Sequence, residues 1–170
     1  MYDQIGKELA QRGVAVDITV DVSVDKGTRG MKVSVKWQNN VCFVGESDSG
    51  HQVMMDGPEE DGGQNQGFRP MELLLLGLGG CTSFDVVTIL KKSRQLIEDC
   101  EVQIEAQRAD QIPAVFTQIS LHFKVMGRNL NEKLVARAVK LSAEKYCSAS
   151  LMLEVGGVDI DHTFEIAEER

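Results

Sequence analysis

Residues 69–85, RPMELLLLGLGGCTSFD, decide how this chain folds. Pro70 suits the first turn of a helix, because the amide hydrogen that proline lacks would have no partner there. From Met71 onward the segment is apolar on nearly every side, and such a helix belongs in the centre of a fold or at an interface. The pattern turns amphipathic toward Gln95 and includes basic residues near its end. We therefore predict one long helix over Met71–Gln95.

Cys81 lies inside this apolar segment, directly after a group of glycines. A cysteine in such surroundings is most often a small core residue. The glycines leave a second interpretation open. If the helix breaks at Gly79 and Gly80, Cys81 lies near a new helix N-terminus, where the pKa of a thiol falls. Asp85 follows one turn later on the same face and would raise the pKa of that thiol if it lies close to it.

Alternating apolar and polar residues on both sides of the helix indicate strands. Before it we expect a hairpin of Val16–Asp25 with Met31–Trp37, two short strands over Val41–Glu46 and Gln52–Met55, and a loop over Gly57–Phe68. After it we expect a second hairpin of Cys100–Ala109 with Val115–Met126, a helix of about 15 residues capped by Asn129 and ending near Cys147, a short helix over Ser148–Glu154 and a last strand from Val158 to Ile166. This order predicts an α+β fold in a single domain.

Composition and charge exclude several classes of protein. The chain has 170 residues, of which 42% are apolar, and a net charge of -8, which is the wrong sign for binding nucleic acid or anionic lipid. The apolar stretch from Leu73 to Phe84 is shorter than the roughly 20 residues of a membrane span. Four cysteines are too few for a disulfide-built secreted scaffold. We expect a cytoplasmic protein with reduced thiols and neither a membrane anchor nor a nucleic-acid partner.

The cysteines and histidines show no local metal-binding pattern. Neither a Cys-x-x-Cys nor a His-x-x-x-His spacing occurs, and there is no glycine-rich phosphate loop, so we expect no metal site and no bound cofactor. Cys42 and Cys100 fall in predicted strands and are interpreted as packing or surface residues. Cys147 falls at a helix break, where residues are more often exposed than in the middle of a helix.

Two motifs at one spacing resemble the OsmC/Ohr family of organic hydroperoxide reductases. The first runs from Arg69 to Cys81, and the second, EKYCS around Cys147, places its cysteine 66 residues after the first. Residues 45–52, GESDSGHQ, and 142–147, SAEKYC, resemble the OsmC-like branch of uncharacterised bacterial proteins. The resemblance covers roughly Met31 to Glu165.

This resemblance implies an OsmC-like fold, with antiparallel sheets around a long cysteine-bearing helix and intertwined subunits in a homodimer. Residues 1–170 would form a single OsmC-like domain, with 1–30 as an N-terminal extension that adds a strand. It also implies a thiol-dependent peroxidase in oxidative stress defence. Cys81 would attack the peroxide and become a sulfenic acid, Cys147 would resolve it as a disulfide, and an external dithiol would reduce the pair. The apolar residues 73–78 favour apolar organic peroxides.

The sequence departs from the family pattern at the groups that support the thiol. The family uses an arginine from its N-terminal meander and a glutamate directly after the helix-opening proline. Here no arginine occurs between residues 31 and 56, and the carboxylate is displaced by one position to Glu72. Arg69 and Arg29 are the candidates to supply the cation. The departure keeps an alternative open, a non-catalytic small-molecule-binding or thiol-sensing protein on the same dimeric fold.

Overall fold

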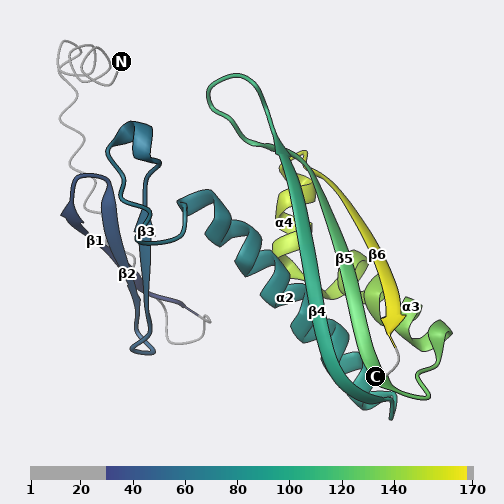
Figure 1. Ribbon diagram of the computed structural model, residues 1–170. Coiled ribbons are helices and arrows are strands. Elements are labelled where there is room, and N and C mark those ends of the chain that lie inside the picture. The colour runs from purple at the N-terminus through teal and green to yellow at the C-terminus, as the bar shows by residue number, and fades with distance from the viewer. Residues whose placement is uncertain (1–29, 168–170) are drawn as a thin grey trace.

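The chain forms a small three-stranded meander and a helix-covered sheet, joined by one loop (Figure 1). The computed structural model describes residues 30–167. The meander contains β1 (Val33–Asn39), β2 (Cys42–Ser47) and β3 (Gln52–Asp56), followed by the 3-10 turn η1 (Glu59–Asp61). The second part contains α2 (Pro70–Lys92), β4 (Leu96–Arg108), β5 (Phe116–Arg128), α3 (Glu132–Leu141), the π-turn η2 (Ser142–Tyr146), α4 (Ser148–Val155) and β6 (Asp159–Ala167).

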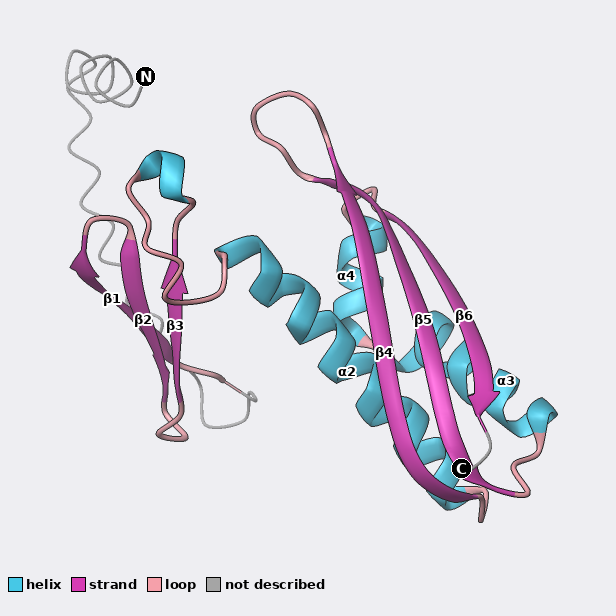
Figure 2. Cartoon of the chain, viewed as in Figure 1, coloured by secondary structure: helices cyan, strands magenta, loops and turns pink. Residues whose placement is uncertain are grey.

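The second sheet has the order β4-β5-β6, and its helices lie on one side of it (Figure 2). Strands β4 and β5 form the predicted antiparallel hairpin. Strand β6 instead runs parallel to β5, which the expectation of antiparallel sheets did not include. The chain reaches β6 through α3, η2 and α4, and a helical crossover of this kind is what a parallel pair requires.

The hydrophobic core lies between this sheet and its helices. The alternation predicted for β5 is confirmed, since every second side chain from Ile119 to Val125 is fully buried. Helix α2 contributes Leu78, Val86 and Leu90 from one face. The other fully or nearly buried members come from the start of β5, from α3 and from the residue that precedes α4: Phe116, Val135, Ala138, Val139 and Cys147.

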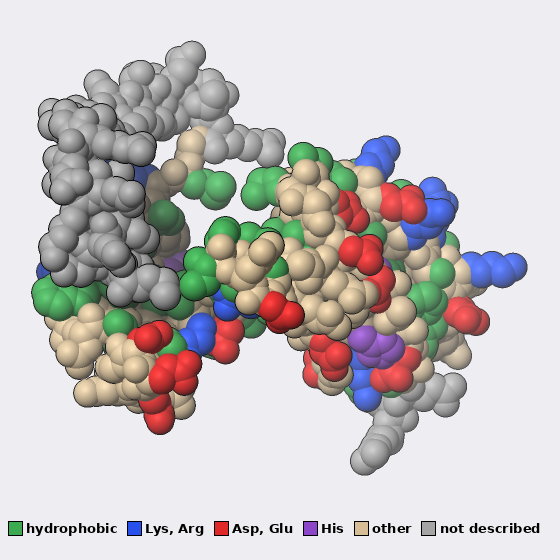
Figure 3. Space-filling view, turned by 90° about the horizontal axis from the view of Figure 1, so that it is seen from above, with side chains coloured by type: hydrophobic (Ala, Val, Ile, Leu, Met, Phe, Trp, Pro, Cys, Tyr) green, Lys and Arg blue, Asp and Glu red, His purple; other side chains and the backbone are tan. Residues whose placement is uncertain are grey.

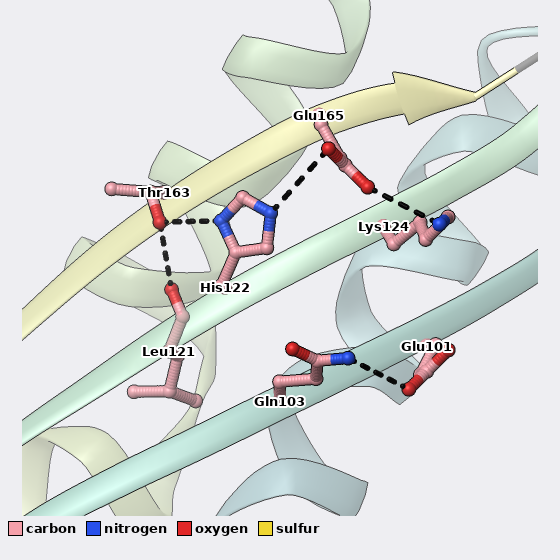
Figure 4. A network of polar contacts seen from close by, with 7 residues as sticks. All are labelled: Glu101, Gln103, Leu121, His122, Lys124, Thr163 and Glu165. Atoms are coloured by element: carbon pink, nitrogen blue, oxygen red, sulfur yellow. Dashed lines mark hydrogen bonds and ion pairs between the residues drawn. The ribbon is translucent and has the colours of Figure 1, made fainter.

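The opposite face of the sheet is polar (Figure 4). His122 Nδ1 and Thr163 Oγ1 lie 2.8 Å apart across the β5–β6 pair, and Lys124 Nζ lies 3.4 Å from Glu165 Oε1. These side chains are largely exposed, so the hydrogen bond and the ion pair contribute little to the free energy of folding. The sheet therefore has one solvated face.

Helix α2 runs unbroken from Pro70 to Lys92, so the alternative of a break at Gly79 and Gly80 is wrong. The reason is packing against β4. A Cβ placed on Gly79 would lie 2.7 Å from Ile104 Cδ1, so the glycine lets the helix approach the sheet closely without bending. Gly80 is exposed, and among the described residues no neighbouring element lies within 4 Å of a Cβ placed there.

The second face of α2 is uncovered within the part of the chain that the structure describes. Leu76 is 51% exposed and Phe84 71% exposed. The helix also has the length and hydropathy of a membrane span, which counting only Leu73 to Phe84 had missed, and 28% of its most apolar window is buried. Its other face packs on β4 and α3, as in the core helix of a folded domain. The expectation of a central position is confirmed for the face that packs on the core, while the interface position stays a prediction for the exposed face.

The meander likewise presents an uncovered apolar face. Val33, Val35 and Trp37 alternate along β1, and the register pairs Val35 with Gly45 and Trp37 with Phe43. No helix within residues 30–167 covers this face, and hydrophobic side chains gather between the two parts of the molecule (Figure 3). The strands predicted over Met31–Trp37, Val41–Glu46 and Gln52–Met55 are confirmed. The strand predicted over Val16–Asp25 lies outside the described residues.

The N-terminus of α3 is capped by an asparagine side chain. The helix cap predicted at Asn129 is wrong by two residues, because Asn131 caps α3 by accepting the amide hydrogens of Lys133 and Leu134.

Asp56, at the end of β3, organises the following loop. Its Oδ2 accepts hydrogen bonds from the amides of Gln64 at 2.8 Å and Gln66 at 3.0 Å. Those bonds, Gln66 first, lower the pKa of Asp56.

We expect Asp56→Asn to loosen the loop from Pro58 to Phe68 while leaving the sheet of β4, β5 and β6 intact. An amide oxygen accepts hydrogen bonds more weakly than a carboxylate does. The pKa of Asp56 is lower in the folded chain than in the unfolded chain, so its contribution is complete above the ordinary aspartate value and is lost as the pH falls through the folded value. Hydrogen exchange of the Gln64 and Gln66 amides measures both effects. Unchanged protection in the variant would contradict this role of Asp56.

Candidate functional site

Three reactive side chains from two distant segments meet beside α2. Within residues 30–167, the Sγ atoms of Cys81 and Cys147 and a carboxylate oxygen of Asp85 all lie within 4.8 Å of one another. Cys81 and Asp85 are four residues apart on α2 and therefore share a face. Cys147 comes from the start of α4. The structure thus brings the two cysteines of the sequence motifs together, with both thiols free.

The position of Cys147 depends on the π-turn that continues α3. The Cys147 amide donates to the Ser142 carbonyl oxygen at 3.0 Å, five residues back in the chain. The buried Ser142 hydroxyl lies 3.2 Å from the Thr82 carbonyl oxygen and 3.4 Å from Asp85 Oδ2, which joins this turn to α2. Cys147 is consequently 0% exposed, so the expectation of an exposed position at the helix break is wrong.

Both sulfurs lie at the N-terminus of α4, where backbone amides point away from the helix. Cys147 is the N-cap residue, and its Sγ accepts the Ser150 amide at 3.4 Å. The backbone amide of Ala149 forms a hydrogen bond that lowers the pKa of Cys81. Helix N-termini favour thiolates for this reason. A helix N-terminus does lie beside Cys81, as the alternative of a break at Gly79 and Gly80 required, but it belongs to α4.

The net effect of the surroundings is nevertheless to raise the pKa of Cys81 above its ordinary value. Burial is the largest cause, followed by the hydrogen bond with Cys147 and by the negative charges of Cys147 and Asp85. The prediction that Asp85 raises the pKa of this thiol is confirmed. None of the groups that act most strongly on Cys81 is a basic side chain.

The supporting residues suggested from the sequence have other contacts. Arg69 Nη1 donates to the backbone carbonyl oxygens of Asp56 and Gly57, which fastens the loop to the end of β3. Glu72 Oε2 accepts the Arg69 amide at 2.8 Å, so it caps its own helix. Neither belongs to the cluster of the two thiols and Asp85. Arg29 lies outside the described residues.

The remaining cysteines are packing residues, and two residues of the site were not predicted from the sequence. Cys42 is 4% exposed in β2, and Cys100 is partly buried in β4, in agreement with their interpretation as packing residues. Ser142 and Ala149 were not identified as site residues. The hydrogen bond from the Cys147 amide to the Ser142 carbonyl spans five residues, and no feature of the sequence indicates this π-turn.

A groove of 420 Å³ borders the cluster on the side of Asp85. It runs between the second half of α2 and the end of α3, and Tyr146 from η2 also lines it. Its lining combines apolar side chains such as Phe84 and Leu141 with Lys92, which lies about two turns beyond Asp85 on α2. Asp85 is the member of the thiol cluster that lines this groove. The groove lining is Phe84, Asp85, Thr88, Ile89, Lys92, Ser93, Leu141 and Tyr146.

Comparison with known proteins identifies relatives over most of the described chain. The OsmC family, described as OsmC-like protein, matches residues 63–163, which include both cysteines of the site. Protein YhfA from Escherichia coli strain K12 is 50% identical over 136 residues, which cover 80% of this chain and 98% of that protein.

Solved structures show the same fold. A hypothetical protein from Aquifex aeolicus VF5 is 29% identical and has a TM-score of 0.73, covering 84% of this chain and 100% of its own. A Legionella pneumophila protein described as an organic hydroperoxide resistance protein OsmC is 19% identical with a TM-score of 0.64, covering 82% of this chain and 99% of its own. At that identity the likeness is one of fold.

We expect Asp85→Asn to lower the pKa of Cys81, because the substitution removes a negative charge that opposes the thiolate. At a fixed pH below the pKa, alkylation of Cys81 should accelerate by up to about tenfold for a change of one pKa unit. The pH profile of Cys81 alkylation, read by peptide mass mapping, measures the change. Asp99→Asn is the matched control, since Asp99 raises the pKa of Cys100 and should leave the Cys81 profile unchanged. A higher Cys81 pKa in Asp85→Asn would contradict the assignment.

Proposed function

Because this chain belongs to the OsmC family, we propose that it is a thiol-dependent peroxidase that reduces organic hydroperoxides in oxidative stress defence. One observation carries the proposal. Two cysteine sulfurs from segments 66 residues apart in sequence lie within 4.8 Å of each other. A thiol pair this close can pass from two thiols to a disulfide with small side-chain movements.

Burial supports different roles for the two thiols. Cys81 is partly exposed, whereas Cys147 is fully buried behind it. A peroxide from solvent reaches Cys81 first, so Cys81 is the attacking residue of the proposal and Cys147 the resolving one. The apolar lining of the groove beside Asp85 favours a hydroperoxide with an apolar organic group.

The proposed reaction has three balanced steps. The Cys81 thiolate attacks the terminal peroxide oxygen, the O–O bond breaks, and the alkoxide leaves as an alcohol with the proton that the thiol released. Cys147 then attacks the sulfur of the Cys81 sulfenic acid, which forms the disulfide and expels water. An external dithiol reduces the disulfide and becomes a disulfide itself. No bound cofactor takes part in these steps.

Thiolate formation is the demanding step in this site. Burial and two neighbouring acidic groups oppose the negative charge on Cys81, while the Ala149 amide favours it. Asp85 lies close enough to the thiols to accept a proton through a small movement. In the proposal, the amides at the start of α4 take the place of a basic side chain and stabilise the attacking thiolate.

The raised pKa of Cys81 also supports the second candidate, a non-catalytic small-molecule-binding or thiol-sensing protein. Such a protein would use the same groove to hold an apolar or electrophilic molecule and would form a stable adduct at Cys81 without turnover. Turnover with a dithiol separates the two candidates.

We further propose that two copies of the chain form the functional unit. The free face of α2 and the apolar face of β1 both lack a cover within residues 30–167. Contiguous apolar surfaces of this kind mark interaction sites. A second copy covers both surfaces at once, because each copy offers an exposed sheet face and an exposed helix face. The long apolar helix then has an internal position in the assembly.

Cys81→Ser is expected to abolish dithiol-supported reduction of cumene hydroperoxide, since the attacking sulfur is gone. Cys147→Ser should still consume about one equivalent of peroxide per chain and stop at a sulfenic acid that dimedone traps. Peroxide consumption and mass mapping measure both results. Cys100→Ser retains both site cysteines and is the control, with turnover expected at the unmodified rate. Full turnover by Cys81→Ser would overturn the proposed function.

Gly80→Leu is expected to convert the dimer to a monomer without unfolding the chain. Within residues 30–167, nothing lies within 4 Å of a Cβ at that position, and leucine has a helix propensity higher than that of glycine by up to about 1 kcal/mol. The added bulk therefore meets no described part of its own chain and should obstruct a second copy. Light scattering after gel filtration gives the oligomeric state, and circular dichroism reports the fold. A monomeric unmodified protein, or a dimer unaffected by the substitution, would refute this arrangement.

A further inference from the structure

The thiol pair and Asp85 together have the composition of a metal site. Two sulfurs and one carboxylate oxygen converge within 4.8 Å, and they belong to two separate elements, α2 and the start of α4. The search for local spacings in the sequence predicted no metal site, and it could not detect this group because Cys147 is 66 residues from Cys81. The three ligands come together only through the tertiary fold.

The distances lie close to those that zinc requires. Zinc binds thiolate sulfur at about 2.3 Å and carboxylate oxygen at about 2.1 Å in tetrahedral sites, so its ligand atoms lie roughly 3.8 Å or less from one another. The observed upper limit of 4.8 Å is about 1 Å larger. Rotation of the Cys81 and Asp85 side chains on the rigid helix can supply that contraction.

Neighbouring groups form hydrogen bonds to two of the three candidate ligands, Asp85 and Cys147. The Ser142 hydroxyl lies 3.4 Å from Asp85 Oδ2 and orients the carboxylate. The Ser150 amide donates to Cys147 Sγ at 3.4 Å, which supports a thiolate there. Outer-shell hydrogen bonds of this kind fix the ligands of metal sites.

Metal binding also changes the charge of this cluster, since two thiolates and one carboxylate carry three negative charges. A divalent cation offsets most of that charge and releases the two thiol protons on binding. Zinc fits better than magnesium or calcium, because both of the latter prefer oxygen ligands.

We propose that Cys81, Asp85 and Cys147 bind one zinc ion per chain, with a fourth position open to water or a small ligand. Both thiolates are then held by the metal, and no electrons are transferred. The consequence for regulation rests on the proposed peroxidase. Bound zinc would prevent Cys81 and Cys147 from reacting with peroxide, and removal of the zinc would make both thiols reactive again.

The test is zinc titration of the reduced, metal-free full-length protein in competition with a chromophoric chelator. We expect one zinc per chain and, near neutral pH, release of the two thiol protons for each zinc. Cobalt should give the thiolate charge-transfer band of two sulfur ligands. Asp85→Asn should weaken zinc binding by about tenfold or more, since loss of even an outer-shell partner has an effect of that size.

Two variants distinguish zinc binding at this cluster from nonspecific zinc binding by cysteine thiols. Cys100→Ser removes a thiol that also lies beside an aspartate, Asp99, and should leave the affinity and stoichiometry unchanged. Cys147→Ser should remove most of the affinity and half of the cobalt charge-transfer intensity. Equal zinc affinity in the unmodified chain, Asp85→Asn and Cys147→Ser would overturn the proposal.

A second measurement distinguishes failure of this inference from failure of the proposed function. The metal-free protein is treated with one equivalent of cumene hydroperoxide with and without zinc, and the Cys81–Cys147 disulfide is quantified. Disulfide formation that zinc does not slow would overturn the regulatory inference and support the peroxidase. Tight zinc binding at the three residues by a chain that peroxide never oxidises would support the metal site and overturn the peroxidase.

Discussion

The contact between the π-turn and α2 is the interaction on which the site depends. The Ser142 hydroxyl is buried against the Thr82 carbonyl oxygen, and the Ser142 carbonyl in turn accepts the Cys147 amide. One residue thus fixes the second cysteine to the helix that carries the first. The fit of Gly79 against Ile104 fixes that helix to the sheet. Together with the rest of the core, these contacts place Cys147 beside Cys81, although 66 residues separate the two in the sequence.

The parts of this structure that could be predicted are those governed by local physics. Alternation indicated β5 because one face of the strand is buried and the other is solvated, and the apolar run after Pro70 indicated α2. Asp85 was recognised as a neighbour of Cys81 because a helix brings residues four apart onto one face. The pairing of Cys81 with Cys147 came from family resemblance, since no local rule relates residues so far apart in sequence.

The errors have physical causes that lie outside the local sequence. The glycines before Cys81 allow a helix to break, but close packing on β4 uses Gly79 for contact and keeps α2 straight. A cysteine at a helix end is often exposed, but Cys147 is drawn into the core by the π-turn. The parallel pairing of β6 depends on where the crossover through α3 and α4 returns the chain. Each outcome was decided by tertiary contacts that sequence periodicity does not report.

The π-turn also bears on how this fold tolerates changes in chain length. Its five residues, Ser142–Tyr146, form one wide turn between α3 and α4. Loss of a single residue within this turn would change the direction in which the chain leaves it at Cys147 by roughly 100°, since an α-helix has 3.6 residues per turn. Cys147 would then face away from α2 while both helices still formed. The loop between β4 and β5 holds no residue of the thiol cluster, so a change in chain length should be tolerated better there than between Ser142 and Cys147.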